Sequence, residues 1–263
     1  MRLLEIILTT VLTALLTDHA QAEDLTVINP DGLHLSAKVD FPSGTGPFPA
    51  IVLAPGQGYH MNLPALEGAT RSLTEQGIAV FRFNWAYFTA QPKGQPSEDL
   101  SKELKDLQAV LSIARKHPKV QAQNLSVGGK SLGSMVAWQA FAADLSLRSA
   151  LLLTPVCSSV PKGETVARSE MQENYPAFET QRRPTLSISG DKDPLCAPNI
   201  LYRTAAASTG AARIAIVGGD HSYENRTLPP PAADATRTRN IAAVATLAAS
   251  FVAEMASTAP NAP

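Results

Sequence analysis

Short apolar runs alternate with longer segments of helical periodicity along most of this chain, and this alternation limits the fold more than any other feature. The run at residues 50–55 is continuously apolar, which is typical of a strand buried on both faces. We predict strands at residues 50–55, 78–84, 124–129, 150–156, 184–190 and 212–219, and helices at 63–76, 98–117, 132–145, 197–208 and 233–256. Alternating strands and helices imply an α/β fold with a mostly parallel central sheet and helices on both faces.

Two segments depart from the alternation. Residues 25–29 and 33–41 flank the turn sequence Asn-Pro-Asp-Gly, so we predict an N-terminal antiparallel hairpin at the edge of the sheet. Residues 157–183 have no strong period and lie between two predicted strands, where a lid is expected. Because this segment is short, we predict a short lid and a fairly open site.

The first residues, 1–22, have the layout of a cleaved signal peptide. Arg2 precedes a mainly apolar stretch, which Glu5 interrupts, and a small-x-small site ends at Ala22. The alternatives are an ordinary N-terminal helix or a retained anchor, but the stretch is short for a membrane span. We therefore predict cleavage after Ala22 and a secreted or periplasmic protein without a stable membrane span.

The composition limits the partners of the remaining chain, which we divide into a single domain at 23–256 and a disordered tail at 257–263. The full chain has a formal net charge of −1, so we predict no binding of nucleic acid. The two cysteines, Cys157 and Cys196, do not have the spacing of a metal site. We predict neither a metal nor a cofactor.

A serine lies between a predicted strand and a predicted helix, in the sequence Gly129-Lys130-Ser131-Leu132-Gly133. This is the context of a nucleophile elbow, a sharp turn that raises the serine hydroxyl above the end of the strand. Small residues two positions before and after the serine allow the strand and the helix to pass closely. We predict that Ser131 is a nucleophile.

A serine nucleophile needs a base to take its proton and an acid to orient that base. His221 is the only one of the five histidines that follows the last predicted strand. Asp193 and Asp191 both follow the strand at 184–190; we favour Asp193, because the chain must turn before a carboxylate can reach the imidazole, and we expect Asp191 to cap that turn. Asp220 is expected to shape the turn beside His221.

A tetrahedral intermediate needs two N–H donors. We assign them to Leu132, which follows the nucleophile, and to Gln57 in the loop after residue 55, with Gly58 or Tyr59 as alternatives. Loop residues near the expected site are candidates to contact the substrate, and we select Tyr59, His60 and Trp85. Ordinary packing is the alternative for each aromatic side chain in these loops, including those of Tyr87, Phe88, Tyr175 and Phe178.

These motifs together resemble the α/β-hydrolase superfamily. More narrowly, "PGQGYHMNLP", "GGKSLG", "SGDKDPLC" and a late "HS" resemble a small dienelactone-hydrolase-like group with testis-expressed members, over about residues 50–225. The resemblance implies the same three residues, Ser131, Asp193 and His221. This chain departs from the group at Pro55, where the group has histidine, and at His60, where it has aspartate.

The resemblance also bears on Cys196, because the group has a cysteine at this position in intracellular members. It implies that Cys196 packs beside the loop that carries Asp193. A disulfide with Cys157 remains an alternative, since both cysteines follow neighbouring strands.

We therefore predict a secreted serine hydrolase that cleaves a small-molecule carboxylic ester through an acyl-enzyme. One alternative is a binding or scaffold protein on a hydrolase fold, because a fold does not establish a function. The other is a thioesterase or peptidase, since the same three groups serve both reactions.

Overall fold

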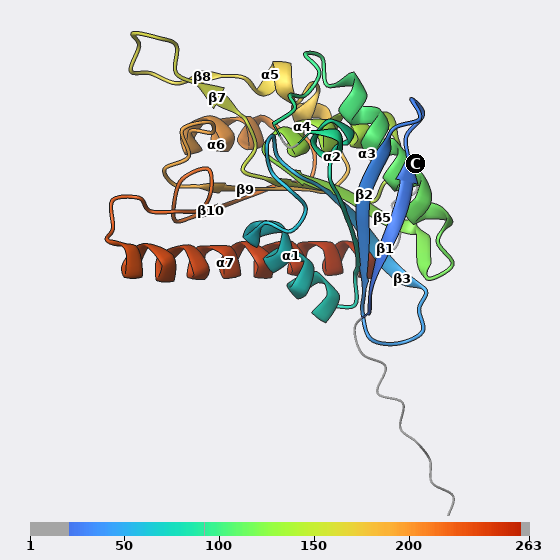
Figure 1. The fold of residues 1–263 in the computed structure, drawn as a ribbon. Helices are drawn as coiled ribbons and strands as arrows, with labels where there is room; N and C mark the ends of the chain where they lie inside the picture. Colours follow the sequence, from blue (N-terminus) through green and yellow to red (C-terminus); the bar gives the residue numbers. More distant parts are fainter. Residues whose placement is uncertain (1–20, 92, 259–263) are drawn as a thin grey trace, which may run out of the picture.

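The computed structural model describes residues 21–91 and 93–258, which form an α/β fold around one large sheet (Figure 1). The eight strands have the order β1-β2-β4-β3-β5-β6-β9-β10, and all neighbours from β4 to β10 are parallel. The strands are β1 (Gln21–Ile28), β2 (His34–Phe41), β3 (Phe48–Ala54), β4 (Ala79–Phe83), β5 (Val120–Lys130), β6 (Ala150–Leu153), β9 (Thr185–Gly190) and β10 (Ala212–Val217). The predicted fold class is confirmed.

Helices cover both faces of this sheet, because successive strand residues point to opposite sides. In β3, Ile51 and Leu53 pack toward α1 and α7, whereas Ala50 and Val52 pack toward α3, α4 and α6. The helices are α1 (Pro64–Glu75), α2 (Ala86–Ala90), α3 (Ser101–Lys116), α4 (Leu132–Ala143), α5 (Met171–Asn174), α6 (Pro198–Ala207) and α7 (Pro230–Ser257), with a 3-10 turn η1 (Phe178–Thr180). Both faces of β3 are fully buried, which explains its continuous apolar sequence.

The N-terminal hairpin is present as predicted, with β1 and β2 antiparallel and Ile28 opposite His34. The Asn29 side chain closes the turn by accepting hydrogen bonds from the N–H groups of Asp31 (3.0 Å) and Leu33 (2.9 Å). Gly32 has a φ of 78°, as this turn requires. Strand β1 begins at Gln21, so the predicted cleavage site after Ala22 lies inside it, and residues 1–20 of the predicted signal peptide lie outside the described residues.

The predicted lid is a short ribbon followed by two small helical turns. Strands β7 (Ser158–Ser159) and β8 (Arg168–Ser169) form the ribbon, which projects from the body of the molecule (Figure 1). After it, Tyr175 and Phe178 are buried against Trp138 of α4, with ring centroids 6.3 and 5.0 Å from the indole. These two aromatic side chains therefore belong to the packed core, which was the alternative to contact with the substrate.

Helix α7 extends beyond the predicted boundaries at both ends. It begins at Pro230, because a proline is tolerated in the first turn of a helix, and it ends at Ser257. The predicted tail therefore does not start at Ser257, and residues 259–263 lie outside the described residues.

Among the described residues, α7 is the one helix whose length and apolar composition would allow it to cross a membrane. Its apolar side chains, including Val244, Ala248 and Val252, are buried against α1 and the sheet. One face of α7 therefore packs against the body of the protein.

Candidate active site

Ser131 lies on a tight turn between β5 and α4. Its φ of 55° and ψ of −123° are rarely adopted by L-residues, and its N–H donates to the carbonyl of Leu153 (2.9 Å). A Cβ on Gly129 would overlap the carbonyl oxygen of Gly133, and a Cβ on Gly133 would overlap that of Pro55. The glycines at these positions allow the backbone to hold the serine above the end of the sheet.

His221 lies in the loop after β10 and contacts Ser131. Its Nε2 is 2.8 Å from Ser131 Oγ, and its Nδ1 is 2.9 Å from each carboxylate oxygen of Asp193. The Asp193 side chain is fully buried, whereas that of His221 is 21% exposed. The structure thus brings the three residues selected from the sequence into one chain of hydrogen bonds that opens to solvent at the serine end.

The acid loop, residues 190–197, holds Asp193 through further hydrogen bonds. The N–H of Leu195 donates to Oδ1 (2.9 Å), and the hydroxyl of Ser189 donates to Oδ2 (3.3 Å). Asp191 instead accepts from the N–H of Gly219 (2.7 Å), so its carboxylate caps a turn and is not directed at His221.

Asp220 also accepts from nearby backbone rather than from His221. Its Oδ1 accepts from the N–H groups of Ser222 (2.8 Å) and Glu224 (3.1 Å), and Arg226 Nε donates to its Oδ2 (2.8 Å). These hydrogen bonds lower the pKa of the Asp220 carboxyl, against the effect of burial. Asp220 therefore shapes the turn that presents His221.

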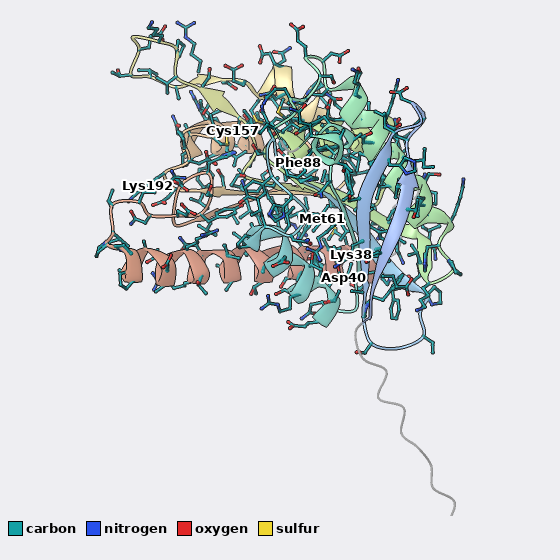
Figure 2. The ribbon with its side chains drawn as sticks, in the orientation of Figure 1. Lys38, Asp40, Met61, Phe88, Cys157 and Lys192 are labelled. Atoms are coloured by element: carbon teal, nitrogen blue, oxygen red, sulfur yellow. A yellow bond between two sulfur atoms is a disulfide. The ribbon has the colours of Figure 1, made fainter. Side chains whose placement is uncertain are left out.

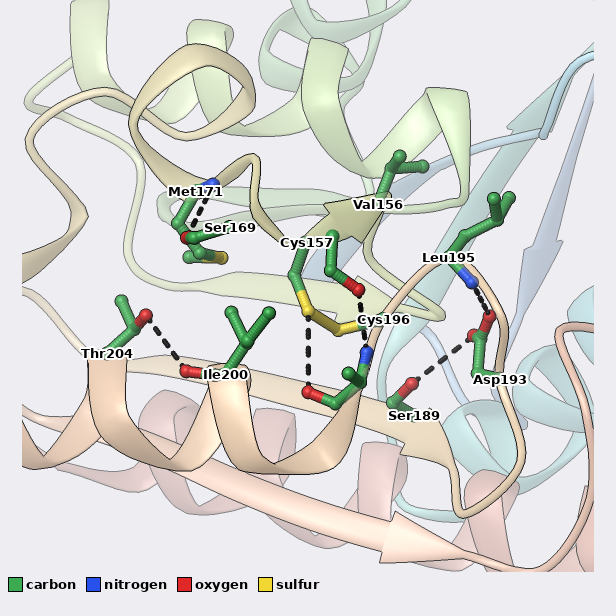
Figure 3. The surroundings of a disulfide bond; sticks show 12 residues. Val156, Cys157, Ser169, Met171, Ser189, Asp193, Leu195, Cys196, Ile200 and Thr204 are labelled. Carbon is green, nitrogen blue, oxygen red and sulfur yellow. Dashed lines mark hydrogen bonds between the residues drawn. A yellow bond between two sulfur atoms is a disulfide. The ribbon is translucent and has the colours of Figure 1, made fainter. Parts of the chain in front are cut away.

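A disulfide joins Cys157, at the end of the β6 loop, to Cys196 in the acid loop (Figure 3). Beside it, the carbonyl of Leu195 accepts from the N–H groups of Cys157 (2.9 Å) and Ser158 (3.0 Å). Cys196 lies near Asp193 within the acid loop, in line with the resemblance, and it is oxidised rather than free. The bond fastens the segment that carries Asp193 to the neighbouring strand.

The backbone around Ser131 has the features of an anion site. Leu132 is the first residue of α4, so its N–H has no carbonyl four residues earlier within the helix to bind. A helix N-terminus also favours negative charge. On the other side, a Cβ on Gly56 would lie 3.4 Å from Ser131 Cβ, so the first loop, residues 55–62, passes directly beside the serine and places Gln57 next to it.

Side chains at the end of β4 hold the first loop in place. Trp85 Nε1 donates to the carbonyl of Pro55 (3.0 Å), and Asn84 Oδ1 accepts from the N–H of Met61 (2.8 Å). Arg82 donates to the carbonyl of Met61 (2.8 Å). Both ends of the loop are therefore anchored through their backbone, which a proline at position 55 permits because only its carbonyl is used.

Arg82 also links the first loop to the edge of the sheet. Its NH2 group is 2.9 Å from Asp40 Oδ2 of β2, so one buried guanidinium bridges Asp40 and the carbonyl of Met61, both labelled in Figure 2. The Arg82 side chain is 6% exposed, and a pair this well shielded is little weakened by salt.

The structure corrects the prediction that Trp85 contacts the substrate. The indole is fully buried and packs edge-on against Phe83, with centroids 4.9 Å apart, because its N–H is needed by the Pro55 carbonyl. Tyr59 lies with its ring 4.7 Å from Lys130 Nζ, and His60 Nδ1 accepts from the N–H of Asn62 (3.2 Å). Neither Tyr59 nor His60 is among the residues that line the cavity at Ser131.

That cavity has a volume of about 450 Å³, is open to solvent and has Ser131 in its wall. Its walls are mainly apolar, with polar groups at Gln57, Gln95, Ser97 and Glu98; the apolar part comprises Pro96, Leu100, Leu132, Met135, Val156 and Leu195. The segment 95–100 lines this cavity and was not predicted from the sequence. Its position after a parallel strand is the one available signal, because ligands bind outside the carboxyl ends of such strands.

Hydrogen bonds to the neighbouring helix and to the first loop fix this cavity wall. Glu103 of α3 accepts from the N–H (3.1 Å) and the hydroxyl (2.5 Å) of Ser97. Gln57 Nε2 donates to Gln95 Oε1 (2.8 Å), which joins the first loop to the wall across the cavity. A different cavity, of about 320 Å³, lies between the lid and α6, and Ser131 does not line it.

The hydroxyl of Tyr175 links the lid to the turn that carries Ser131. Ser134 Oγ donates to the carbonyl of Ser131 (2.6 Å) and lies 2.7 Å from the hydroxyl of Tyr175, which also accepts from the N–H of Val156 (2.8 Å). Burial raises the pKa of Tyr175, so the hydroxyl stays protonated.

Within residues 21–91 and 93–258, no group of three or more His, Cys, Asp or Glu side chains is placed to hold a metal ion. The Ser131 hydroxyl and the His221 imidazole lie within hydrogen-bonding distance, so they can exchange a proton.

The comparisons with known proteins agree with this fold. Residues 48–253 match the family described as alpha/beta hydrolase domain, whereas a comparison with curated sequences finds no significant match. The esterase domain of a Rhodothermus marinus protein has 19% identity, covers 89% of this chain and 98% of its own, and has a TM-score of 0.64. XC6422 from Xanthomonas campestris, described as a serine hydrolase without a lid, has 20% identity, coverages of 91% and 97%, and a TM-score of 0.62. Est1E from Butyrivibrio proteoclasticus has 15% identity, coverages of 89% and 99%, and a TM-score of 0.65.

Proposed function

The chain belongs to the alpha/beta hydrolase family, and from this premise we propose that it is a serine hydrolase that cleaves carboxylic esters through an acyl-enzyme. One observation carries the proposal: His221 Nε2 lies 2.8 Å from Ser131 Oγ while its Nδ1 lies 2.9 Å from Asp193. A hydroxyl beside an oriented imidazole is the arrangement that activates a serine.

In the first half of the reaction, His221 takes the proton from the Ser131 hydroxyl as Oγ attacks the ester carbonyl carbon. Asp193 accepts the Nδ1–H of His221, which keeps Nε2 free to act as the base and stabilises the imidazolium that forms. The carbonyl oxygen becomes an oxyanion, which the N–H groups of Leu132 and Gln57 stabilise. The intermediate then collapses, and His221 returns the proton to the departing alcohol.

In the second half, water replaces the alcohol. His221 takes a proton from this water, the hydroxide attacks the acyl carbon, and a second oxyanion forms in the same place. Its collapse restores the Ser131 hydroxyl with the proton from His221 and releases a carboxylic acid. The reaction needs no group other than these side chains and backbone donors.

The cavity supports a small ester as the substrate. A volume of about 450 Å³ with mainly apolar walls suits the acyl or alkyl part of a small organic ester. Several proteins of similar fold are described as esterases, which favours an ester over an amide or a thioester.

The test is covalent labelling of Ser131. We expect a fluorophosphonate probe to modify the folded protein, and peptide mass spectrometry to locate the adduct on Ser131, with no adduct in Ser131→Ala. A panel of activated esters with short and long acyl chains then measures turnover against the same variant. Labelling without ester turnover would favour a thioesterase or peptidase, and a folded protein that does not label would favour a scaffold.

We also propose that the protein is secreted or periplasmic, with residues 1–22 removed. The layout of the leader supports this location, and so does the disulfide between Cys157 and Cys196, because such bonds persist in oxidising compartments. Cell fractionation and N-terminal sequencing test it: a mature chain in the cytoplasm that still begins at Met1 would refute the proposal.

A further inference from the structure

Lys130, the residue before the nucleophile, is a buried charged side chain that the proposed reaction does not use. It is the last residue of β5 and lies opposite Leu153 of β6. The whole residue is only 2% exposed. Burying an ammonium group in this way is costly unless its donors are satisfied, so its presence beside the site calls for an explanation from its contacts.

Its contacts lead to three separate segments of the site. The Lys130 ammonium donates to the backbone carbonyl of His221 (2.9 Å) and to the hydroxyl of Thr154 at the end of β6 (3.2 Å). It also lies 4.7 Å from the ring centroid of Tyr59 in the first loop, within cation–π range. Both hydrogen-bond acceptors are neutral oxygens, and one of them belongs to the residue that carries the base.

The loop that carries His221 must be held at an accurate distance from Ser131. His221 lies in a tight turn in which Gly219 has a φ of 109° and Tyr223 a φ of 61°. Asp220 and Asp191 hold the turn at the base of this loop, as described above. The bond from Lys130 differs because it acts on the backbone of His221 itself and originates from the residue next to Ser131. It therefore ties the base directly to the strand end that presents the nucleophile.

We propose that Lys130 is a positioning residue, whose hydrogen bond to the carbonyl of His221 holds the imidazole at its 2.8 Å separation from Ser131 Oγ. The inference rests on the proposed function, because it assigns a role within that same site. Displacements of about 1 Å can reduce a reaction rate about 100-fold, so a single such bond has a measurable effect on turnover.

The charge of Lys130 is compatible with this role. Burial lowers the pKa of its ammonium to about 8, and the carboxylates of Asp193 and Asp220 oppose this effect. The side chain is therefore charged at neutral pH, and a charged donor forms a stronger hydrogen bond to the His221 carbonyl than a neutral amine does.

The test compares Lys130→Met with Thr154→Val. Methionine has a similar length and no donor, so it removes both hydrogen bonds, whereas Thr154→Val removes the second acceptor and leaves the bond to His221. The first readout is the proton NMR resonance of the His221 Nδ1–H, assigned by its loss in His221→Gln. The second readout is kcat and KM on a small activated ester.

We expect Lys130→Met to lose or broaden the His221 resonance and to lower kcat about 10- to 100-fold, with KM changed less than about twofold. Thr154→Val should keep the resonance and retain kcat within about threefold. A folded Lys130→Met protein with a sharp resonance and wild-type kcat would overturn the proposal, and so would an equal loss in Thr154→Val.

Two further results remain decisive. If Lys130→Met does not fold, Lys130→Arg retains a charged donor in the same place; the proposal requires this variant to keep the resonance, and its loss in folded protein would count against it. If the wild-type protein hydrolyses no ester, the proposed function fails, while the NMR comparison still decides whether Lys130 positions His221.

Discussion

Replacing Trp85 with phenylalanine tests whether this indole positions the first loop or contacts the substrate. Phenylalanine keeps an aromatic ring beside Phe83 but removes the N–H that donates to the Pro55 carbonyl at 3.0 Å. The carbonyl is then left buried without this partner, which costs about 1–3 kcal/mol. We expect the free energy of unfolding, measured in urea, to fall by that amount.

The same change should slow turnover without altering the choice of substrate. Pro55 lies two residues before Gln57, so a looser loop displaces one proposed oxyanion donor. Complete removal of such a donor lowers kcat by about 100- to 1000-fold, and we expect about 10-fold for displacement alone. Because Trp85 is fully buried, KM should change by the same factor for an acetyl and an octanoyl ester.

Trp138→Phe is the matched control for this experiment. Trp138 is equally buried, and its Nε1 donates to the carbonyl of Pro176 at the same distance, 3.0 Å, but in the lid. We expect a similar loss of stability with kcat within about threefold of wild type. The positioning role of Trp85 would be refuted by a KM that rises only for the octanoyl ester, or by an unchanged kcat in a destabilised protein.

Three other predictions follow from the site. Asp193→Asn should lower kcat about 10⁴-fold, because the imidazole loses its orienting carboxylate. Asp191→Asn should retain kcat within about 10-fold of wild type, and equal losses of kcat in the two variants would contradict the assignment of Asp193 as the acid. Replacing Cys157 and Cys196 together by serine removes a covalent link across 39 residues and should lower the free energy of unfolding by about 4 kcal/mol. It should also lower kcat, because the acid loop is no longer fastened. Urea unfolding measures the first effect and steady-state kinetics the second, and an unchanged unfolding midpoint would refute the estimate. The pKa of Lys130 is lowered to about 8 in the folded state, so below that pH both states hold the proton and the burial penalty is fully present. As pH rises from about 8 to about 10.5, the folded state releases the proton first and stability should rise by about 3 kcal/mol, a gain that urea unfolding should find in the wild type and not in Lys130→Met.

The part of the candidate site that could be predicted is the part that depends on which residues directly follow each strand in the sequence. Ser131, Asp193 and His221 each follow a predicted strand, and parallel strands present their carboxyl ends at one edge of a sheet. The choice of Asp193 over Asp191 also followed from local geometry, since a loop must turn before its carboxylate can reach a neighbouring strand. In the structure, His221 lies within hydrogen-bonding distance of both Ser131 and Asp193.

The errors concern side chains whose surroundings come from distant segments. Trp85 follows a strand in the sequence as a substrate-contacting residue would, yet its indole turns inward to the Pro55 carbonyl. The cavity wall at 95–100 has no recognisable residue pattern in the sequence. Glu103 holds this wall by a hydrogen bond, but its position in the sequence is typical of an exposed helix residue.

The sequence by itself determined the sheet, its flanking helices and the turn at Ser131. The hydrophobic periodicity indicates which face of each strand or helix is buried, and the glycines around Ser131 indicate a sharp turn there. Only the tertiary structure decided that Cys157 meets Cys196, that Trp85 is buried, and that the Lys130 ammonium reaches the carbonyl of His221. The physical reason is that these contacts depend on strand order and on the paths of loops. Lys130 and His221 lie 91 residues apart, and no local pattern encodes the distance between them.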